Sequence, residues 1–184
     1  MANKMSFYFL SYSLDESLTS IVDYDLNGFD LLSYWKRIRL KEIDFSTLKL
    51  FADFSSKRYS DLLSNSLNMY VLSERAKKTI ESKYLKEVIF SKVDVVDLNN
   101  SNDIQVYWVM TPLLESDCID IGKSSILDED VVIDLVLSKE RLPASSNYFS
   151  ITNKPSFFVS SERFKENWQA AQLIGLDFDV IELK

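Results

Sequence analysis

The residue types on which most enzymes rely are scarce or missing in this sequence. It contains no histidine, so Ser-His-Asp and Cys-His nucleophilic arrangements, histidine general bases and histidine metal sites cannot form. Its three glycines, Gly28, Gly122 and Gly175, are too far apart to build the glycine-rich loops that hold phosphates. We therefore predict no nucleotide cofactor and no metal site.

Paired carboxylates are the one catalytic device that the composition still permits. An acid-rich stretch in the second half of the chain comprises Glu115, Asp117, Asp120, Asp128, Glu129 and Asp130. Two of these groups in one cleft could perform glycosidase-type acid-base catalysis, whereas solvated loop carboxylates are the simpler interpretation and the one we favour. A calcium loop does not fit, because Asp128-Glu129-Asp130 leads directly into an apolar run without a glycine turn. We predict that the chain is not an enzyme.

The single cysteine, Cys118, indicates where the protein works. It cannot form an internal disulfide, which is typical of a reducing compartment. Asp117 and Asp120 flank it and would raise its pKa, so we interpret it as an inert core thiol. Because the sequence also has no long apolar stretch and no cleavable leader, we expect a cytoplasmic protein without a membrane partner.

Charge and aromatic residues predict the kind of partner. Twenty-eight acidic residues oppose twenty-one basic ones, giving a formal charge of −7, so we expect no nucleic acid partner and instead a basic protein surface. Lys36, Arg37, Arg39 and Lys41 are interpreted as a solvated face. The predicted contacts are the acidic turn Asp128, Glu129 and Asp130, then Asp23 and Asp25, and Trp108 as an aromatic anchor. Trp35 and Tyr107 could also be anchors, although for all three aromatic residues a place in the core is the simpler interpretation.

An internal repeat predicts the elements that position these residues. Met69–Lys77 aligns without a gap on Phe157–Lys165, and the match continues to Val93 and Ile181. The shared plan is a short strand, a serine helix cap (Ser73 or Ser161), one amphipathic helix and a second strand. Gly175 suits the left-handed residue that ends a helix. Arg75 and Arg163, which follow the caps, are interpreted as helix-surface charges.

The rest of the chain predicts mostly strands. We expect an N-terminal strand at 5–10, a short helix or turn at 60–68, a flexible surface loop at 99–103, a central strand at 131–137 and a hairpin formed by 148–151 and 156–159. The expected fold class is α+β, with duplicated strand-helix-strand units packed on a mainly antiparallel sheet. Residues 1–68 would supply a strand and a helical or loop segment, and residues 69–184 the repeated region (repeats about 69–93 and 157–181), in one compact domain.

The second half of the chain contains, in order, Asp117-Cys118-Ile119-Asp120, Ser124, Ile133 to Leu137, Pro143, Tyr148-Phe149, Val159-Ser160-Ser161-Glu162 and Gly175-Leu176-Asp177-Phe178. This order resembles the immunity proteins of bacterial polymorphic toxin systems, above all immunity protein family eleven or a near relative. The segment from Val71 to Phe90 is similar to the family's first copy of the same unit, except that Glu87-Val88 stands at the place of Gly175-Leu176. Membership would imply a protein without catalysis that binds a cognate toxin of the same bacterium and blocks it.

Two other functions stay open at this point. A non-catalytic adaptor or scaffold would use the same duplicated surface for several partners. A carboxylate-dependent hydrolase would require two acids of the 115–130 region to face one cleft.

Overall fold

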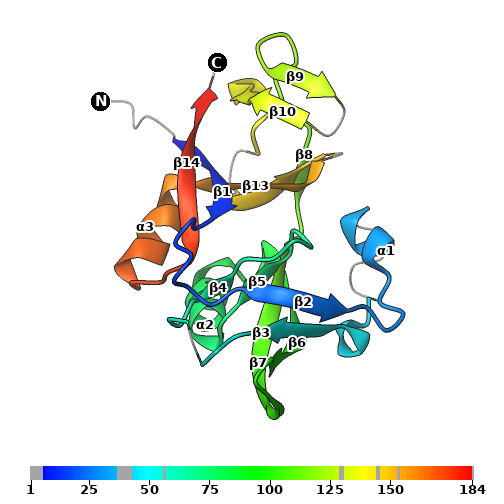
Figure 1. Cartoon of the computed structure of the whole chain (residues 1–184). Helices are drawn as coiled ribbons and strands as arrows, with labels where there is room; N and C mark the ends of the chain where they lie inside the picture. The colour runs from blue at the N-terminus through cyan, green and yellow to red at the C-terminus, as the bar shows by residue number, and fades with distance from the viewer. Residues whose placement is uncertain are drawn as a thin grey trace.

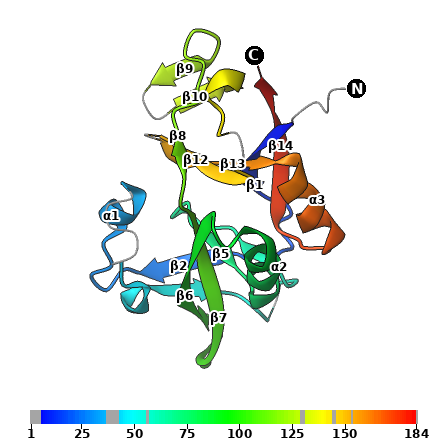
Figure 2. The same cartoon turned by 180° about the vertical axis from the view of Figure 1, so that it is seen from behind.

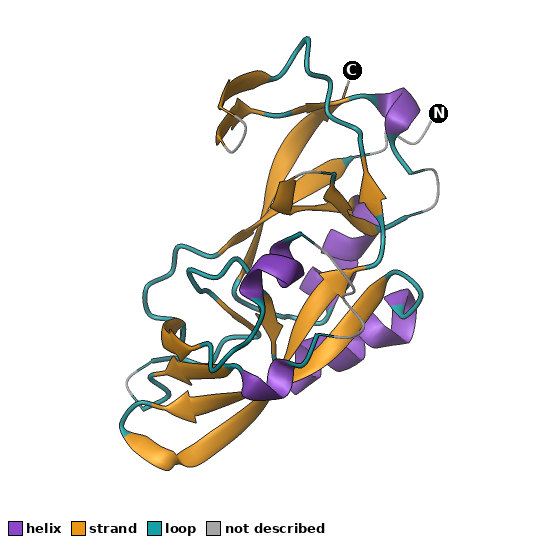
Figure 3. Ribbon diagram, turned by 90° about the vertical axis from the view of Figure 1, so that its right-hand side faces the viewer, coloured by secondary structure: helices purple, strands orange, loops and turns teal. Residues whose placement is uncertain are grey.

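The structure is a computed structural model that describes residues 6–36, 43–55, 57–128, 131–143, 146–152 and 154–183. Within these residues the strands form two six-stranded sheets and one separate hairpin, which Figure 3 shows as distinct groups of orange strands. The described helical segments are α1 (Leu31–Trp35), α2 (Glu74–Tyr84), α3 (Glu162–Ala170) and the short 3-10 turns η2 (Phe45–Thr47) and η3 (Lys139–Arg141). The fold is α+β, as predicted, and none of the described helices is long and apolar enough to cross a membrane.

The two sheets have related strand orders (Figure 1). The first sheet runs in the order β2 (Ile21–Asp25), β3 (Lys49–Ala52), β6 (Val88–Asp97), β7 (Asn100–Pro112), β5 (Tyr70–Leu72) and β4 (Leu62–Leu63). The second sheet runs in the order β11 (Val136–Leu137), β14 (Leu176–Leu183), β1 (Phe7–Tyr12), β13 (Lys154–Ser161), β12 (Tyr148–Ile151) and β8 (Glu115–Ser116). Both sheets are mixed, because β3–β6, β11–β14 and β8–β12 are parallel pairs among antiparallel ones.

The predicted duplication is confirmed. In each copy the two strands of the repeat are not neighbours, because a third strand from elsewhere in the chain lies between them. In the first copy β5, α2 and β6 enclose β7, which lies between the two strands and is antiparallel to both. In the second copy β13, α3 and β14 enclose β1 in the same way. The register also repeats, since Trp108 lies opposite Leu72 and Tyr8 lies opposite Ser160, the residue that aligns with Leu72. The N-terminal strand therefore has in the second sheet the place that β7 has in the first.

Both long helices begin at the predicted serine caps. The Ser73 hydroxyl accepts a hydrogen bond from the Ala76 N–H, and the Ser161 hydroxyl accepts one from the Phe164 N–H. These bonds satisfy first-turn amides that have no partner inside the helix. The end of α3 differs from the prediction. The residue with positive φ directly after the helix is Gln172 (φ 53°), whereas Gly175, which also has a positive φ (99°), lies just before β14.

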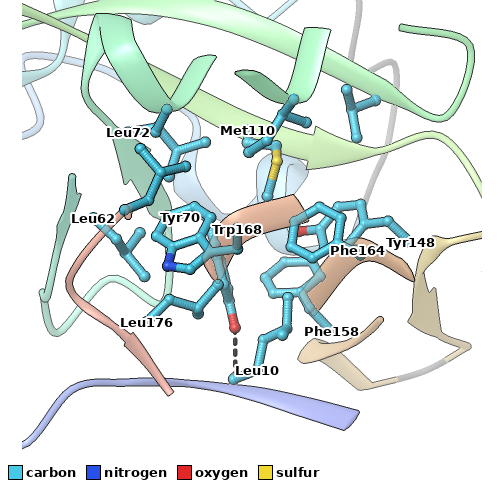
Figure 4. Packing of buried hydrophobic residues seen from close by; sticks show 14 of the residues in the cluster. Leu10, Leu62, Tyr70, Leu72, Met110, Tyr148, Phe158, Phe164, Trp168 and Leu176 are labelled. Carbon is cyan, nitrogen blue, oxygen red and sulfur yellow. Dashed lines mark hydrogen bonds between the residues drawn. The ribbon is translucent and has the colours of Figure 1, made fainter. Parts of the chain in front are cut away.

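The central core lies between the two sheets and joins the copies. It holds the buried faces of α2 and α3 together with Tyr70, Tyr148 and Phe158 (Figure 4). Tyr70 and Phe158, which align in the repeat, meet edge to face with ring centroids 4.4 Å apart. The opposite face of each sheet packs on a further cluster, as strand alternation requires: Val71 faces one and Val159 the other.

The turns that follow the two helices contact the opposite copy reciprocally. After α2, the Glu87 carboxylate accepts hydrogen bonds from Asn147, the Tyr148 N–H and the Ser146 hydroxyl. After α3, the Ile174 carbonyl accepts from the Asp61 and Leu62 N–H groups. The departure of Glu87 from the glycine of the second copy is thereby explained, because its side chain makes the contact that the backbone of Ile174, next to Gly175, makes in the second copy.

Three predicted segments differ in the structure. The 131–137 run is not a central strand: β10 (Val131–Asp134) pairs only with β9 (Ser125–Asp128), and β11 lies at the edge of the second sheet. The Ser124 hydroxyl bonds both the N–H and the carbonyl of Val136, which fixes the start of that edge strand. Residues 60–68 contain β4 and a turn at 66–67, but no helix. The expected loop at 99–103 belongs mostly to β7, because the chain reverses between Asp97 and Asn100. The hairpin of β12 and β13 is confirmed.

Candidate interaction face

Three of the predicted contact residues, Asp23, Asp25 and Trp108, lie on one face of the first sheet. The strand register places directly opposite residues on the same face, and three rows follow from it. These rows are Asp25–Lys49–Asp94–Val106, Asp23–Phe51–Val96–Ile104 and Lys92–Trp108. We call this set the uncovered face.

The uncovered face is the continuation of the surface on which α2 packs. Phe90 and Met110, one row further along β6 and β7, pack in the core that contains α2. Beyond Trp108 the two strands run past the start of α2, as Figure 2 shows. There Ile104 is 54% and Val106 42% exposed, whereas Val95 and Tyr107 on the other face are buried. The same strands are thus packed on one side and open to solvent on the other.

Trp108 is half-buried at the border between α2 and the uncovered face. Its indole N–H donates to Glu74 Oε2 at 2.5 Å, and Lys77 Nζ lies 4.4 Å from the ring centroid. The second copy repeats this arrangement, because the Tyr8 hydroxyl donates to Glu162 and Lys165 Nζ lies 3.9 Å from the Tyr8 ring. A hydrogen bond and a cation–π contact therefore fix the first turn of each helix on its sheet. This recurrence gives Trp108 an architectural role as well as an exposed edge.

Acidic side chains predominate around the uncovered face. Asp23, Asp25 and Asp94 lie on it, and Lys49 and Lys92 are its basic residues. The Lys92 ammonium lies 3.7 Å from the Asp94 carboxylate, with both side chains more than half exposed. Asp53 and Asp103 lie near the turn of the β6–β7 hairpin. The face is therefore apolar along β7 and acidic towards β2 and the hairpin end.

The other predicted contact region is at a different place in the fold. Asp128 ends β9 and pairs with Val131 of β10. Glu129 and Asp130 lie outside the described residues, as do Arg37, Arg39 and Lys41. Figures 1 and 2 both show β9 and β10 at the end of the molecule away from β2. The structure brings Asp23, Asp25 and Trp108 together but does not add this hairpin to them.

The remaining candidate residues have structural roles. Tyr107 is buried and stacks on Phe54, and the Trp35 indole donates to the Leu67 carbonyl. Cys118 is fully buried, and this burial raises the pKa of its thiol, as expected for a core cysteine. Arg75 is not a free surface charge, because its guanidinium pairs with the buried Asp61 carboxylate.

Three acids of the 115–130 region, Glu115, Asp117 and Asp120, are exposed or paired with basic side chains. Glu115 and Asp117 are exposed, with Asp117 3.6 Å from Arg141, and the Asp120 carboxylate pairs with Lys123 at 3.1 Å. This hydrogen bond from Lys123 lowers the pKa of Asp120, so it favours an ionised, solvated group. Among the residues that the structure describes, no three side chains of the metal-binding types are grouped to hold an ion.

Sequence reasoning missed the apolar part of the uncovered face. Phe51, Val96, Ile104 and Val106 did not stand out, because each is an ordinary strand residue and only the register brings them together. A signal was present in the alternation on both sides of Leu98-Asn99, which is typical of a hairpin longer than the repeated unit.

The fold and its open face define an α+β protein made of two copies of one split unit, with an extended sheet surface on the first copy. The chain belongs to the Imm11 immunity protein family, whose model matches residues 28–182. This match includes the repeated segments 69–93 and 157–181 and confirms the resemblance that the sequence motifs predicted. No curated protein matches the chain.

Proposed function

We propose that this chain neutralises a cognate bacterial toxin by binding it directly in the cytoplasm of the cell that produces both. Membership of an immunity protein family carries the proposal. The sequence supports it, since the absence of histidine and of phosphate-binding loops leaves few routes to catalysis. Neutralisation is then stoichiometric: one bound chain covers or distorts the toxin's active site.

The charge of the chain supports a toxin with a basic surface, such as a nuclease. At −7, the chain attracts a basic protein and repels nucleic acid and anionic membranes. Electrostatic attraction raises association rates, which suits an inhibitor that must capture its target before damage occurs. Two acidic regions are available for this contact: the uncovered face with Asp23 and Asp25, and the turn at 128–130.

Co-expression with the toxin encoded by the neighbouring gene tests the proposal. We expect that toxin to stop growth when expressed alone and to become harmless when this chain is present. Purified chain should also inhibit the purified toxin at a ratio of one to one. A neighbour that is harmless alone, or one that still kills in the presence of this chain, would refute the function.

Pull-down separates this function from that of an adaptor. We expect the chain to recover one toxin domain, whereas recovery of several housekeeping proteins would favour an adaptor.

Charge reversal at Asp128, Glu129 and Asp130 should weaken toxin capture and reduce its dependence on salt if that turn contributes. Unchanged binding would remove the turn from the contact surface.

A further inference from the structure

We propose that the uncovered face, centred on Ile104 and Val106, is the surface that docks on the toxin, and that it receives a basic protein surface with apolar side chains at its centre. This inference rests on the proposed function and specifies where the partner binds. It assigns the contact to the first copy of the duplicated unit rather than to both.

The strands that occupy the same place in the two copies differ in length where this face lies. β7 has thirteen residues, whereas β1, its counterpart in the second sheet, has six. The additional length of β7, together with the end of β6, forms the hairpin that carries Val96, Ile104 and Val106 past α2. The extension does not pack α2, because that helix meets the sheet at Phe90, Trp108 and Met110. Ordering the additional residues costs conformational entropy. A contact between the extension and a partner would explain why the extension is present despite this cost.

The exposed side chains of the extension suit a protein partner. Ile104 and Val106 alternate on one strand, and Val96 lies directly opposite Ile104 and beside Phe51. Together they form one apolar strip that is continuous by register, bordered by the half-buried Trp108. Interfaces place apolar anchors at the centre of a polar rim, and the acids at β2 and the hairpin end provide that rim.

Charge identifies the partner among the occupants that an apolar strip could accept. Asp23, Asp25 and Asp94 lie on the face itself, and Asp53 and Asp103 lie at the hairpin end. A second copy of this chain would bring the same acids against these, and like charges across an interface are unfavourable. A surface rich in lysine and arginine is complementary to this rim.

Substitution of Val106 or Ile104 by arginine tests the proposal. Both positions are exposed strand positions, so Val106→Arg and Ile104→Arg should fold with an unchanged urea midpoint, while each places a cation against a basic partner. Titration calorimetry with the purified, catalytically inactivated toxin of the neighbouring gene should show Kd raised by about tenfold or more. Val180→Arg is the matched control, because Val180 is 77% exposed on β14 in the second sheet; its Kd should stay within about twofold of wild type.

Hydrogen exchange gives a second readout that does not depend on a variant. In the complex, protection should increase at the amides of 92–108 and of 21–25. If both arginine variants bind the toxin with wild-type affinity and these amides gain no protection in the complex, the proposal is overturned, whereas neutralisation by binding still stands. A wild-type chain that neither binds nor inhibits the toxin would instead refute the function. A homodimer that Val106→Arg converts to a monomer would show that a second copy occupies the face, and would also overturn the proposal.

Discussion

Gly175 is the position at which a single methyl group should damage the contact between the two copies most. It has φ +99°, which side chains rarely adopt, and an added Cβ would lie 2.3 Å from Ser60 Oγ and 2.5 Å from the Leu62 carbonyl oxygen. The Ser60 side chain can rotate, but the Leu62 carbonyl belongs to the backbone of β4. The Leu62 N–H also donates to the carbonyl of Ile174. The two residues must therefore move apart.

The expected loss of stability has two parts. Strain from the backbone conformation costs about 1–2 kcal/mol, and overpacking costs about 1–3 kcal/mol. Gly175→Ala should thus lower the free energy of unfolding by about 2–5 kcal/mol. For a chain of this size the melting temperature should fall by roughly 2–4 °C for each kcal/mol.

The other two glycines separate the two causes. Gly28 has φ +82° and no neighbour within 4 Å of an added Cβ, whereas Gly122 has an ordinary contact at 3.6 Å. Gly28→Ala should lose about 1 kcal/mol from strain alone, and Gly122→Ala should change stability by less than about 0.5 kcal/mol. Urea denaturation followed by circular dichroism measures all three. Equal midpoints for Gly175→Ala and Gly28→Ala would refute the steric argument.

Three further predictions concern buried polar groups. Burial opposes ionisation of Asp61, but hydrogen bonds from Arg75, Ser73 and the Ile174 N–H outweigh it and lower its pKa. Stability that depends on this ionisation is therefore present above the unfolded pKa of about 3.9 and is lost as the pH falls through the lower folded value. Asp61→Asn should flatten the fall in urea midpoint below pH 4, and an unchanged slope would contradict this. Among the described residues the buried Trp168 indole N–H has no hydrogen-bond partner, so Trp168→Phe should cost less than about 1 kcal/mol and Trp168→Ala about 3–5 kcal/mol. Thermal unfolding compares the two, and similar losses would be inconsistent with this reasoning. Because Cys118 is buried and its thiol pKa is raised, a thiol reagent should label it only as fast as the protein opens; immediate labelling of the native protein would disprove that.

The duplicated unit could be predicted from the sequence because its signals are local. Ser73 and Ser161 each cap a helix, and the apolar spacing of Ala76, Ile80 and Tyr84 defines the buried stripe of α2. Both observations depend only on neighbours a few residues away. The same holds for the hairpin of β12 and β13.

The partnership of distant strands could not be predicted in the same way. Nothing in Phe7–Tyr12 indicates that this strand inserts between β13 and β14, since that choice depends on the whole second sheet. The 131–137 run has the composition of a central strand, yet the contacts of Ser124 place part of it at a sheet edge. Likewise, charge alone singles out Asp23 and Asp25, but only the register places them beside Phe51 and Lys49.

The place of β1 also has a consequence for biosynthesis. During translation this strand leaves the ribosome long before β13 and β14, the two neighbours that will hold it on both edges. The first sheet, with its uncovered face, can meanwhile assemble from β2 to β7 as each segment emerges. The second sheet closes only when the nascent chain has reached β14, so its completion is a late event.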